Sequence, residues 1–381
     1  MNSFLANIRP RLASEPDAPV FIVSGNESAD LDSIVSALTT AFFLQRYSPK
    51  SICIPFINTE RADLPLRNDT VYVFEQTKVD PSLLFFRDEL DTTLKKIPAD
   101  RMSLFLVDHN LLSGSLSQWN NVAVAGVIDH HDDEGLYTTA NPRRIEVTGS
   151  CTSLIAETFM KELQTKVDSE DCKSIARLMM GPILVDTGNL NPAINKAKPL
   201  DIAMHDSLLP LTGWSNTDFY YKAISDARHD TSKLSCYDLL RKDYKEWTVT
   251  RPSGDSVKVG ISSVPGLVQK YIARDSKQAI HDAIQRWSNN RSLDLYIALW
   301  QDDLGAANGG YQREFLMEPY TTGFDSLREA LEASDMKLER LTDLDTDDFV
   351  ASGGRVYRQH NTTWSRKLIW PLVEKLLVEG K

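Results

Sequence analysis

The chain has few cysteines and no long apolar run, and each scarcity argues against a class of protein. Its four cysteines are spread over 381 residues without a Cys-x-x-Cys pair. This spacing argues against a disulfide framework and against a structural zinc site. No apolar run approaches the roughly 18 residues of a membrane span, and residues 1–19 lack the apolar core of a signal peptide. We therefore expect no membrane partner and a cytoplasmic location.

The chain also lacks an excess of basic over acidic residues. The formal net charge is −11, whereas a general nucleic-acid binder needs a broad basic surface to meet the phosphate backbone. A nucleic-acid duplex is therefore not an expected partner. An acidic protein can still bind a polyanionic substrate where metal ions and a local basic patch supply the positive charge.

The composition is that of a globular protein. Hydrophobic residues make up 42% of the chain and charged residues 25%, which is typical of soluble domains. A chain of 381 residues exceeds one ordinary hydrophobic core, so we expect two domains. The polar segment 229–234 is the best linker candidate, which predicts domains over residues 1–228 and 235–381.

The segment that organises the chain is a predicted strand end. Residues 122–128 form an apolar run without helical spacing, which predicts a buried strand. The run stops at Asp129, which is followed by His130 and His131. The carboxyl ends of parallel strands open into the crevice where α/β proteins place their chemistry. One histidine can face a metal while the other faces substrate, although the triplet alone is equally compatible with a solvated turn.

Two carboxylates follow the first predicted strand. Residues 20–24 are apolar and break at Gly25, and a helix is predicted over about residues 33–46. Asp30 and Asp32 lie at the corner between them. A helix N-cap explains one aspartate, but it does not explain two at a spacing of two. Two hard oxygen donors that project together suit a divalent cation.

The same pattern returns at two further aspartates. The predicted strand over residues 102–107 ends at Asp108, and the apolar run over residues 181–185 leads to Asp186. Carboxylates gathered without metal would repel one another and raise one another's pKa values. Divalent cations resolve that conflict, and an Asp-rich set with one His suits Mg²⁺, Mn²⁺ or Co²⁺ better than structural zinc.

The small, hydroxyl-rich residues 149–153 open a helix predicted to run to about residue 164. Such a helix start can present free N–H groups to a phosphate. Simple capping of the helix explains the same residues equally well. The sequence leaves both alternatives open.

Taken in this order and strand context, the four clusters resemble those of the DHH phosphoesterases. That superfamily includes manganese-dependent inorganic pyrophosphatases, prune-like proteins and the fungal cytosolic exopolyphosphatase. Residues 25–34, 149–151 and 240–245 are most similar to the exopolyphosphatase branch. The resemblance covers nearly the whole chain. It implies an α/β fold with an N-terminal DHH domain, built on a largely parallel sheet flanked by helices, and a smaller C-terminal α/β DHH-associated domain, with the active site in the cleft between them.

Carried onto this sequence, the resemblance implies ligands for two divalent cations, which would be Mg²⁺, Mn²⁺ or Co²⁺. Asp30 and Asp108 would bind the first cation. Asp32, Asp108 and His130 would bind the second. Asp108 would bridge the two cations, and Asp186 would complete the site.

Three further residues have other implied roles at this site. Asp129 would hold the strand end from behind the ligands, and His131 would face the phosphate. Asn26 stands where the pyrophosphatases have a metal-binding His. A neutral amide is a poorer ligand than imidazole, which favours the exopolyphosphatase branch. Asn26 then either contacts a metal or water, or only caps the turn after Gly25.

The resemblance also implies that the C-terminal domain binds substrate. Residues 355–367 contain four cations and no acid. Arg366 and Lys367 match the family's Ser-Arg-Lys pattern before a proline-containing helix, and Lys245 matches its other substrate-binding Lys. With His131, these three form the implied substrate-binding set. A solvated face is the alternative explanation for any one of the cations.

The implied activity is that of an exopolyphosphatase, a hydrolase that removes terminal orthophosphate from inorganic polyphosphate. Two cations would lower the pKa of a bridging water, which would then attack the terminal phosphorus. Asp108, as the bridging ligand, and His131, at the phosphate, are the candidate catalytic residues. The basic side chains would offset the charge that develops on the leaving chain. A monomer is expected.

Two other functions stay open. A DHH phosphohydrolase that acts on pyrophosphate, short nucleotides or nucleoside polyphosphates would carry the same metal ligands. A prune-like regulatory binding protein would carry only a relict of the site. The complete ligand set argues against a relict, because drift would erode the ligands first.

Overall fold

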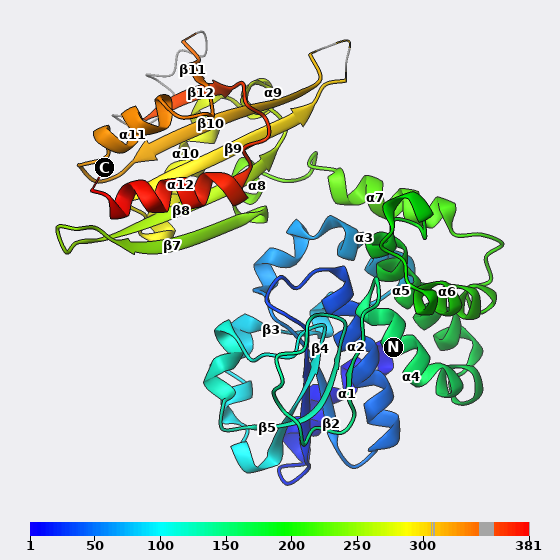
Figure 1. Ribbon diagram of the computed structural model, residues 1–381. Helices are drawn as coiled ribbons and strands as arrows, with labels where there is room; N and C mark the ends of the chain where they lie inside the picture. The colour runs from blue at the N-terminus through cyan, green and yellow to red at the C-terminus, as the bar shows by residue number, and fades with distance from the viewer. Residues whose placement is uncertain (306, 308, 343–353, 381) are drawn as a thin grey trace. The chain divides into compact units, whose positions relative to one another are not determined.

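The structure is a computed structural model that describes residues 1–305, 307, 309–342 and 354–380. Two compact units make up the chain, each with its own six-stranded sheet and hydrophobic core (Figure 1). The predicted two-domain α/β class is therefore confirmed. Along the described residues, no helix combines the length and the apolar character that a membrane span requires.

Unit 1, Met1–Asp230, is built on a sheet of parallel strands in the order β3-β2-β1-β4-β5-β6. The central strands are short and apolar because both faces of a parallel sheet are covered. The strands are β1 (Val20–Ser24), β2 (Ile52–Ile57), β3 (Phe85–Phe86), β4 (Met102–Val107), β5 (Ala123–Asp129) and β6 (Arg143–Ile145).

Helix α2 (Leu31–Tyr47) is the centre of unit 1. Its residues from Leu31 to Phe43 are buried on every face, because the helix packs on β1 and β2 and also on α4 and α5. A helix buried all round needs apolar and small side chains instead of one apolar stripe. The other helices are α1 (Asn2–Ser14), α3 (Asn68–Thr77), α4 (Cys151–Lys166), α5 (Ser169–Thr187), α6 (Pro199–Thr212) and α7 (Asp218–His229).

Gly25, directly after β1, allows α2 to begin close to the strand end. A Cβ atom at this position would lie 2.7 Å from the Cβ of Ser33, a distance at which a side chain does not fit. The absence of a side chain at Gly25 lets backbone and helix approach each other. Asp30, the N-cap of α2, and Asp32, in its first turn, thereby reach the carboxyl end of the sheet.

One expectation about this unit is wrong. The sequence places Asp186 after a separate apolar run, but residues 169–187 form the single helix α5, and Asp186 lies in its last turn. A proline in a helix interior removes a hydrogen bond and usually ends or kinks the helix. Here the helix continues through Pro182, and Ile183 and Leu184 are fully buried beyond it. Burial in the core therefore outweighs the local signal for a break.

Unit 2, Thr231–Lys381, has a mixed sheet in the order β11-β12-β10-β9-β8-β7. Helices α11 and α12 cover one face, and α8, α9 and α10 lie on the other (Figure 1). Strands β8 and β9 are parallel, and the other paired strands are antiparallel. The elements are α8 (Cys236–Lys242), β7 (Tyr244–Thr250), β8 (Ser256–Pro265), α9 (Val268–Asp275), α10 (Lys277–Arg291), β9 (Leu295–Asp303), β10 (Tyr311–Pro319), α11 (Asp325–Glu332), β11 (Leu338–Arg340), β12 (Arg355–Gln359) and α12 (Arg366–Val378).

A buried carboxylate fastens two loops of unit 1 together. Asp201, in the first turn of α6, is fully buried. It accepts hydrogen bonds from the backbone N–H groups of Gly149 (2.8 Å), Ser150 (3.3 Å) and Lys198 (2.7 Å), and from the hydroxyl of Ser153 (2.6 Å). Hydrogen bonds to a charged acceptor are stronger than neutral ones. The loop before α6 is thereby tied to the start of α4.

Replacing Asp201 with Ala should destabilise unit 1, because three backbone N–H groups and one hydroxyl lose their acceptor. An unpaired buried donor costs about 1–3 kcal/mol, so we expect the free energy of unfolding to fall by at least about 3 kcal/mol. Urea denaturation followed by circular dichroism measures this change. Asp206→Ala is the matched control on α6, since its carboxylate is 71% exposed. Equal stability of the two variants would contradict the fastening role.

Candidate metal centre

A cavity of about 480 Å³ lies at the carboxyl end of the unit 1 sheet. Side chains from the end of β4, the segment after β5, the start of α2 and the last turn of α5 line it. The structure thus brings together the metal-ligand candidates that the sequence places far apart. Those that line the cavity are Asn26, Asp30, Asp32, Asp108, His130, His131 and Asp186.

Asp108 is the most enclosed of these carboxylates, with 2% of its surface exposed. Its backbone is left-handed, with φ of 61°, which is uncommon outside glycine and marks a strained turn. One carboxylate oxygen, Oδ2, accepts hydrogen bonds from the hydroxyl of Ser33 at 2.5 Å and from the amide of Asn26 at 2.9 Å. The other, Oδ1, lies 3.1 Å from Nε2 of His130. Oδ1 is therefore the oxygen that faces the other ligands.

The two histidines are held by different partners. Nδ1 of His130 lies 3.0 Å from the carbonyl oxygen of Thr148. A carbonyl only accepts, so Nδ1 carries the proton and Nε2 is free to bind a metal. Nδ1 of His131 lies 2.8 Å from Oδ1 of Asp129, which leaves Nε2 of His131 open in a side chain that is 55% exposed. Asp108, His130 and His131 each offer one ligand atom, and these atoms lie within 4.8 Å of one another.

Asp129 holds the backbone of both histidines and the ring of His131. It is fully buried, and its Oδ1 accepts hydrogen bonds from the backbone N–H groups of His130 at 2.8 Å and His131 at 3.3 Å. Asn110 donates to its other oxygen at 2.5 Å. Burial alone would raise the pKa of Asp129, but the hydrogen bonds from His131 and Asn110 outweigh it and lower this pKa. Asp129 is therefore a stable anion behind the ligands.

Asp32 receives the start of helix α4. Its two oxygens accept hydrogen bonds from the backbone N–H groups of Cys151 at 2.6 Å and Thr152 at 2.9 Å, and from the hydroxyls of Ser150 at 2.8 Å and Thr152 at 2.6 Å. Neither alternative for residues 149–153 holds in its simple form, because Ser150 makes no side-chain cap hydrogen bond and a carboxylate from another helix binds the N–H groups. These N–H groups stabilise the buried negative charge of Asp32.

The pKa values of three carboxyl groups and one histidine at this site are raised. Burial, and next the charge of Asp32, raises the pKa of Asp30 and of Asp186, and it raises that of Asp108 to about 7. Burial alone would lower the pKa of His130, but its hydrogen bond with Asp108 and the charge of Asp32 raise it to about 10. Each of these shifts favours a bound proton. The cavity therefore attracts positive charge.

The donor set fits divalent cations. Oδ2 of Asp186 is buried and has no hydrogen-bond partner among the described residues, which is costly unless a cation completes its environment. Carboxylate oxygens with one imidazole nitrogen are ligands of Mg²⁺ and Mn²⁺. Asp30, Asp32, Asp108, His130 and Asp186 supply this set.

Asn26 has its amide turned with nitrogen toward the carboxylates. Its Nδ2 donates to the carbonyl oxygen of Asp108 at 3.1 Å and to Oδ2 at 2.9 Å. Its Oδ1 accepts from the backbone N–H of Ser28 at 2.9 Å and from the hydroxyl of Ser28 at 2.6 Å. This arrangement favours the alternative in which Asn26 caps the turn after Gly25, since the oxygen that would bind a metal already has two donors.

Three cations in the wall of the cavity were missed by the sequence interpretation. They are Lys196, Lys198 and Arg228. The polar, proline-containing segment before α6 reads as an ordinary surface loop, and no local motif singles out its lysines. Two lysines at a spacing of two, shortly after Asp186, are the only signal that this loop carries.

Of the predicted substrate-binding residues of unit 2, Arg366 contacts the residue just before β7. Arg366, the first residue of α12, donates to the carbonyl oxygen of Asp243 at 2.9 Å and to its carboxylate at 2.5 Å. Lys245 is two residues further on and is exposed on β7, and Lys367 is exposed on α12. Arg366 is thus already paired, but a guanidinium has five donors and can bind a further anion.

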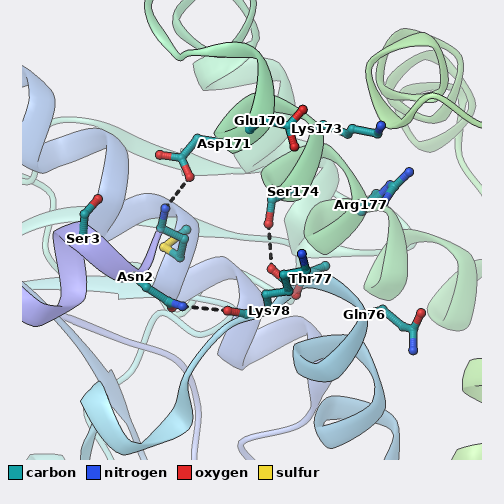
Figure 2. A pocket seen from close by; sticks show the side chains of 11 residues that line it. Asn2, Ser3, Gln76, Thr77, Lys78, Glu170, Asp171, Lys173, Ser174 and Arg177 are labelled. Atoms are coloured by element: carbon teal, nitrogen blue, oxygen red, sulfur yellow. Dashed lines mark hydrogen bonds and ion pairs between the residues drawn. The ribbon is translucent and has the colours of Figure 1, made fainter.

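A second cavity in unit 1, of about 350 Å³, has a different character (Figure 2). Several of its polar groups satisfy one another: the N-terminal ammonium binds Asp171 at 2.7 Å, Asn2 donates to the carbonyl of Lys78 at 2.7 Å, and Ser174 donates to that of Thr77 at 2.8 Å. No histidine or cysteine is among the described residues that line it. The cavity at the sheet end is therefore the better candidate for a metal centre.

Comparison with known proteins also divides the chain into an N-terminal and a C-terminal domain. Residues 20–183 match the DHH family, N-terminal domain, and residues 222–376 match the DHHA2 domain. A Schizosaccharomyces pombe protein named "Putative exopolyphosphatase" is 29% identical over 97% of this chain and 94% of its own length. Exopolyphosphatase PRUNE1 of Homo sapiens is 30% identical over 96% of this chain and 78% of its own length. A manganese-dependent inorganic pyrophosphatase of Methanocaldococcus jannaschii is 25% identical over 74% of this chain and 82% of its own.

The fold has a solved counterpart. A crystal structure of a putative family II inorganic pyrophosphatase from Methanococcus jannaschii matches with a TM-score of 0.51 and 22% identity, over 94% of this chain and 99% of the other. The names of these relatives describe hydrolases of phosphoric anhydrides. Together with the matched domains, they show that the chain belongs to the DHH family, with an N-terminal DHH domain followed by a DHHA2 domain.

Proposed function

We propose that this chain is a metal-dependent exopolyphosphatase, which removes terminal orthophosphate from inorganic polyphosphate. The observation that carries this proposal is the convergence of four carboxylates and Nε2 of His130 on one cavity. Such a cluster needs cations to offset its repulsion. Relatives named exopolyphosphatase support the substrate class, and a manganese-dependent relative supports the use of divalent cations.

Two divalent cations, Mg²⁺, Mn²⁺ or Co²⁺, are proposed to bind at the cavity. When bound, cations of this kind lower the pKa of a water toward neutrality and polarise a phosphoryl oxygen. Asp108 is the proposed bridging ligand, because its Oδ1 lies toward His130 while Ser33 and Asn26 hold its Oδ2. The remaining ligands are Asp30, Asp32, His130 and Asp186.

His131 is proposed to act on the phosphate directly. Its Nδ1 is bound to Asp129, so Nε2 is the nitrogen that can reach a substrate. The hydrogen bond with Asp129 raises the pKa of His131, which favours the protonated ring. A protonated Nε2 can donate to a phosphate oxygen and offset the charge that develops as the leaving chain departs.

The basic residues of unit 2 are proposed to bind further phosphate groups. Lys245, Trp247 and Val249 are at a spacing of two on β7, so their side chains lie on the same side of the strand. Val249 packs in the hydrophobic core that α12 covers. Arg366 and Lys367 begin that helix. Guanidinium and ammonium groups gathered in this way suit a polyanion. The assignment of catalysis to residues 1–228 and of substrate binding to residues 235–381 stays a prediction, as does a cleft between them.

One assay separates this function from the alternatives. Phosphate release from long polyphosphate, tripolyphosphate, pyrophosphate and a short oligonucleotide is compared with Mg²⁺, Mn²⁺ and Co²⁺ in turn. Highest activity on polyphosphate is expected. Release from pyrophosphate or a nucleotide alone would point to another DHH phosphohydrolase, and no release from any substrate would favour a prune-like regulatory protein. A monomeric state and a cytoplasmic location also stay predictions.

Asp108→Asn should reduce turnover by at least about 10³-fold, because both cations lose a shared anion. Substrate turnover with saturating Mn²⁺ measures the effect, and circular dichroism checks that the variant is folded. Asp133→Asn is the control, because that carboxylate lies outside the cavity and forms an exposed hydrogen-bonded pair with Arg143. Turnover within a few-fold of the wild type would remove Asp108 from the site.

The metal-free protein should lose stability as the pH rises. The pKa of Asp108 rises from about 4 when unfolded to about 7 in the folded chain, and that of His130 from about 6.5 to about 10. The folded state therefore keeps protons that the unfolded state releases, so the free energy of unfolding falls with pH across these two windows.

Melting temperatures in EDTA at about pH 6 and about pH 8.5 measure this slope. Excess Mn²⁺ should reduce it, because bound cations replace the protons. Asp108→Asn should also reduce it in EDTA, because the variant removes one of the repelling carboxylates. A wild-type slope that is the same with and without Mn²⁺ would contradict a metal-binding cluster.

Replacing Arg366 and Lys367 with Ala should weaken polyphosphate binding and leave Mn²⁺ affinity almost unchanged. Added salt should weaken wild-type binding more steeply than variant binding, because charge pairing is screened. Michaelis constants across a salt series, with a Mn²⁺ titration beside them, provide the measurement. Replacing Lys375, an exposed cation on the last turn of α12, is the control. Identical constants and salt slopes would refute a phosphate-binding role.

A further inference from the structure

We propose that Lys196 and Lys198 of unit 1 form a second phosphate-binding element, which holds substrate phosphate oxygens beside the carboxylates. The proposal rests on the proposed function and deepens it, because it names residues outside the predicted substrate-binding set. Both lysines line the same cavity as Asp30, Asp108 and Asp186. Phosphate recognition would then begin on the unit that also holds the cations.

The backbone presents the two lysines on one side. Lys198 is extended, with φ of −108° and ψ of 165°. Lys196 and Lys198 both line the cavity, whereas Ala197 between them does not, as for two residues at a spacing of two that project to the same side. Within the described part of the chain, neither ammonium group has an ion-pair partner. Both are therefore available to an anion in the cavity.

The loop is fixed in place relative to the carboxylates. Asp201 accepts the backbone N–H of Lys198 at 2.7 Å and that of Gly149 at 2.8 Å. A Cβ atom on Gly149 would lie 3.1 Å from the carbonyl oxygen of Lys196, so the two backbones are in close contact. The segment that begins at Gly149 continues into the N–H groups that bind Asp32. Hydrogen bonds therefore fix the position of the lysine loop relative to Asp32, a metal-ligand candidate.

The charges of the cavity explain why lysines are useful here. A substrate phosphate brings its own negative charge toward four carboxylates, and bound cations must already offset the charge of those carboxylates. Two further ammonium groups attract oxygens that the cations do not contact. Arg228 lines the same cavity but lies 3.8 Å from Asp69, so its charge is partly engaged elsewhere. The two lysines are the stronger candidates.

A simpler role is that the lysines only reduce repulsion among the carboxylates. The two roles differ in what a lysine replacement does. If the lysines bind phosphate, their removal weakens anion binding even when the cations are saturating. If they only offset carboxylate charge, their removal tightens Mn²⁺ binding and leaves phosphate binding unchanged.

The test compares the wild-type chain, the double variant Lys196→Ala with Lys198→Ala, and Lys161→Ala. Lys161 is an exposed lysine on α4 outside the cavity. Isothermal titration with orthophosphate, in saturating Mn²⁺, measures anion binding without turnover. Titration with Mn²⁺ alone measures the metal sites, and the Michaelis constant for tripolyphosphate is measured beside them. Thermal unfolding checks each protein, and Lys196→Gln replaces the double variant if that variant does not fold.

We expect the double variant to bind orthophosphate about tenfold more weakly, in line with the loss of charged hydrogen bonds, with a shallower dependence on salt. Mn²⁺ affinity should stay equal or increase. Orthophosphate affinity equal to that of Lys161→Ala would overturn the proposal. Lysine-dependent phosphate binding without release of phosphate from any substrate would support this site while rejecting the proposed hydrolase.

Discussion

Repulsion among clustered carboxylates, of which Asp32 and Asp108 are buried, is the constraint on which the rest of unit 1 depends. Asp30, Asp32, Asp108 and Asp186 share one cavity, and burial together with neighbouring charge raises the pKa of Asp30, Asp108 and Asp186. Charges buried in this way are stable only when donors or cations meet them. The surrounding chain supplies hydrogen-bond donors to Asp32 and to Oδ2 of Asp108, whereas Oδ2 of Asp186 has no hydrogen-bond partner among the described residues. Oriented but incompletely paired groups of this kind suit a metal site.

Hydrogen-bond partners hold several of the candidate metal ligands in place around the cavity. The start of α4 and its hydroxyls bind Asp32, Ser33 and Asn26 bind one oxygen of Asp108, and the carbonyl of Thr148 fixes the tautomer of His130. At Asp108 and His130 these partners hold Oδ2 and Nδ1, and the other atom of each side chain, Oδ1 and Nε2, lies where the two residues meet. Rigid orientation of this kind reduces the reorganisation that accompanies ligand binding and chemistry.

Negative charge at the centre also accounts for the cations at the rim. A protein with a net charge of −11 cannot attract a polyphosphate by its overall field. Local positive charge must therefore come from bound metals and from basic side chains. In unit 1 the proposed source is the lysine pair before α6, and in unit 2 it is the group around Lys245 and Arg366. Two separate groups would suit a substrate with several phosphates.

The sequence predicts the strands over residues 20–24, 102–107 and 122–128, the helix after the first of them and the polar clusters that follow. Apolar runs and the polar residues that end them are local signals. Asp186 could be recognised as a ligand candidate from the sequence. Its place on a helix could not, because Pro182 signals a helix break locally and burial of the helix overrides that signal. No local signal in the sequence identifies Asp32 as the partner of the α4 start, or places Lys196 and Lys198 at the cavity. The start of α4 depends on hydrogen bonds to Asp32 and Asp201, which are both remote from it along the chain. Asp201 also binds the nearby backbone of Lys198, so only the packing of α2, α4 and α6 brings the lysine loop to the cavity.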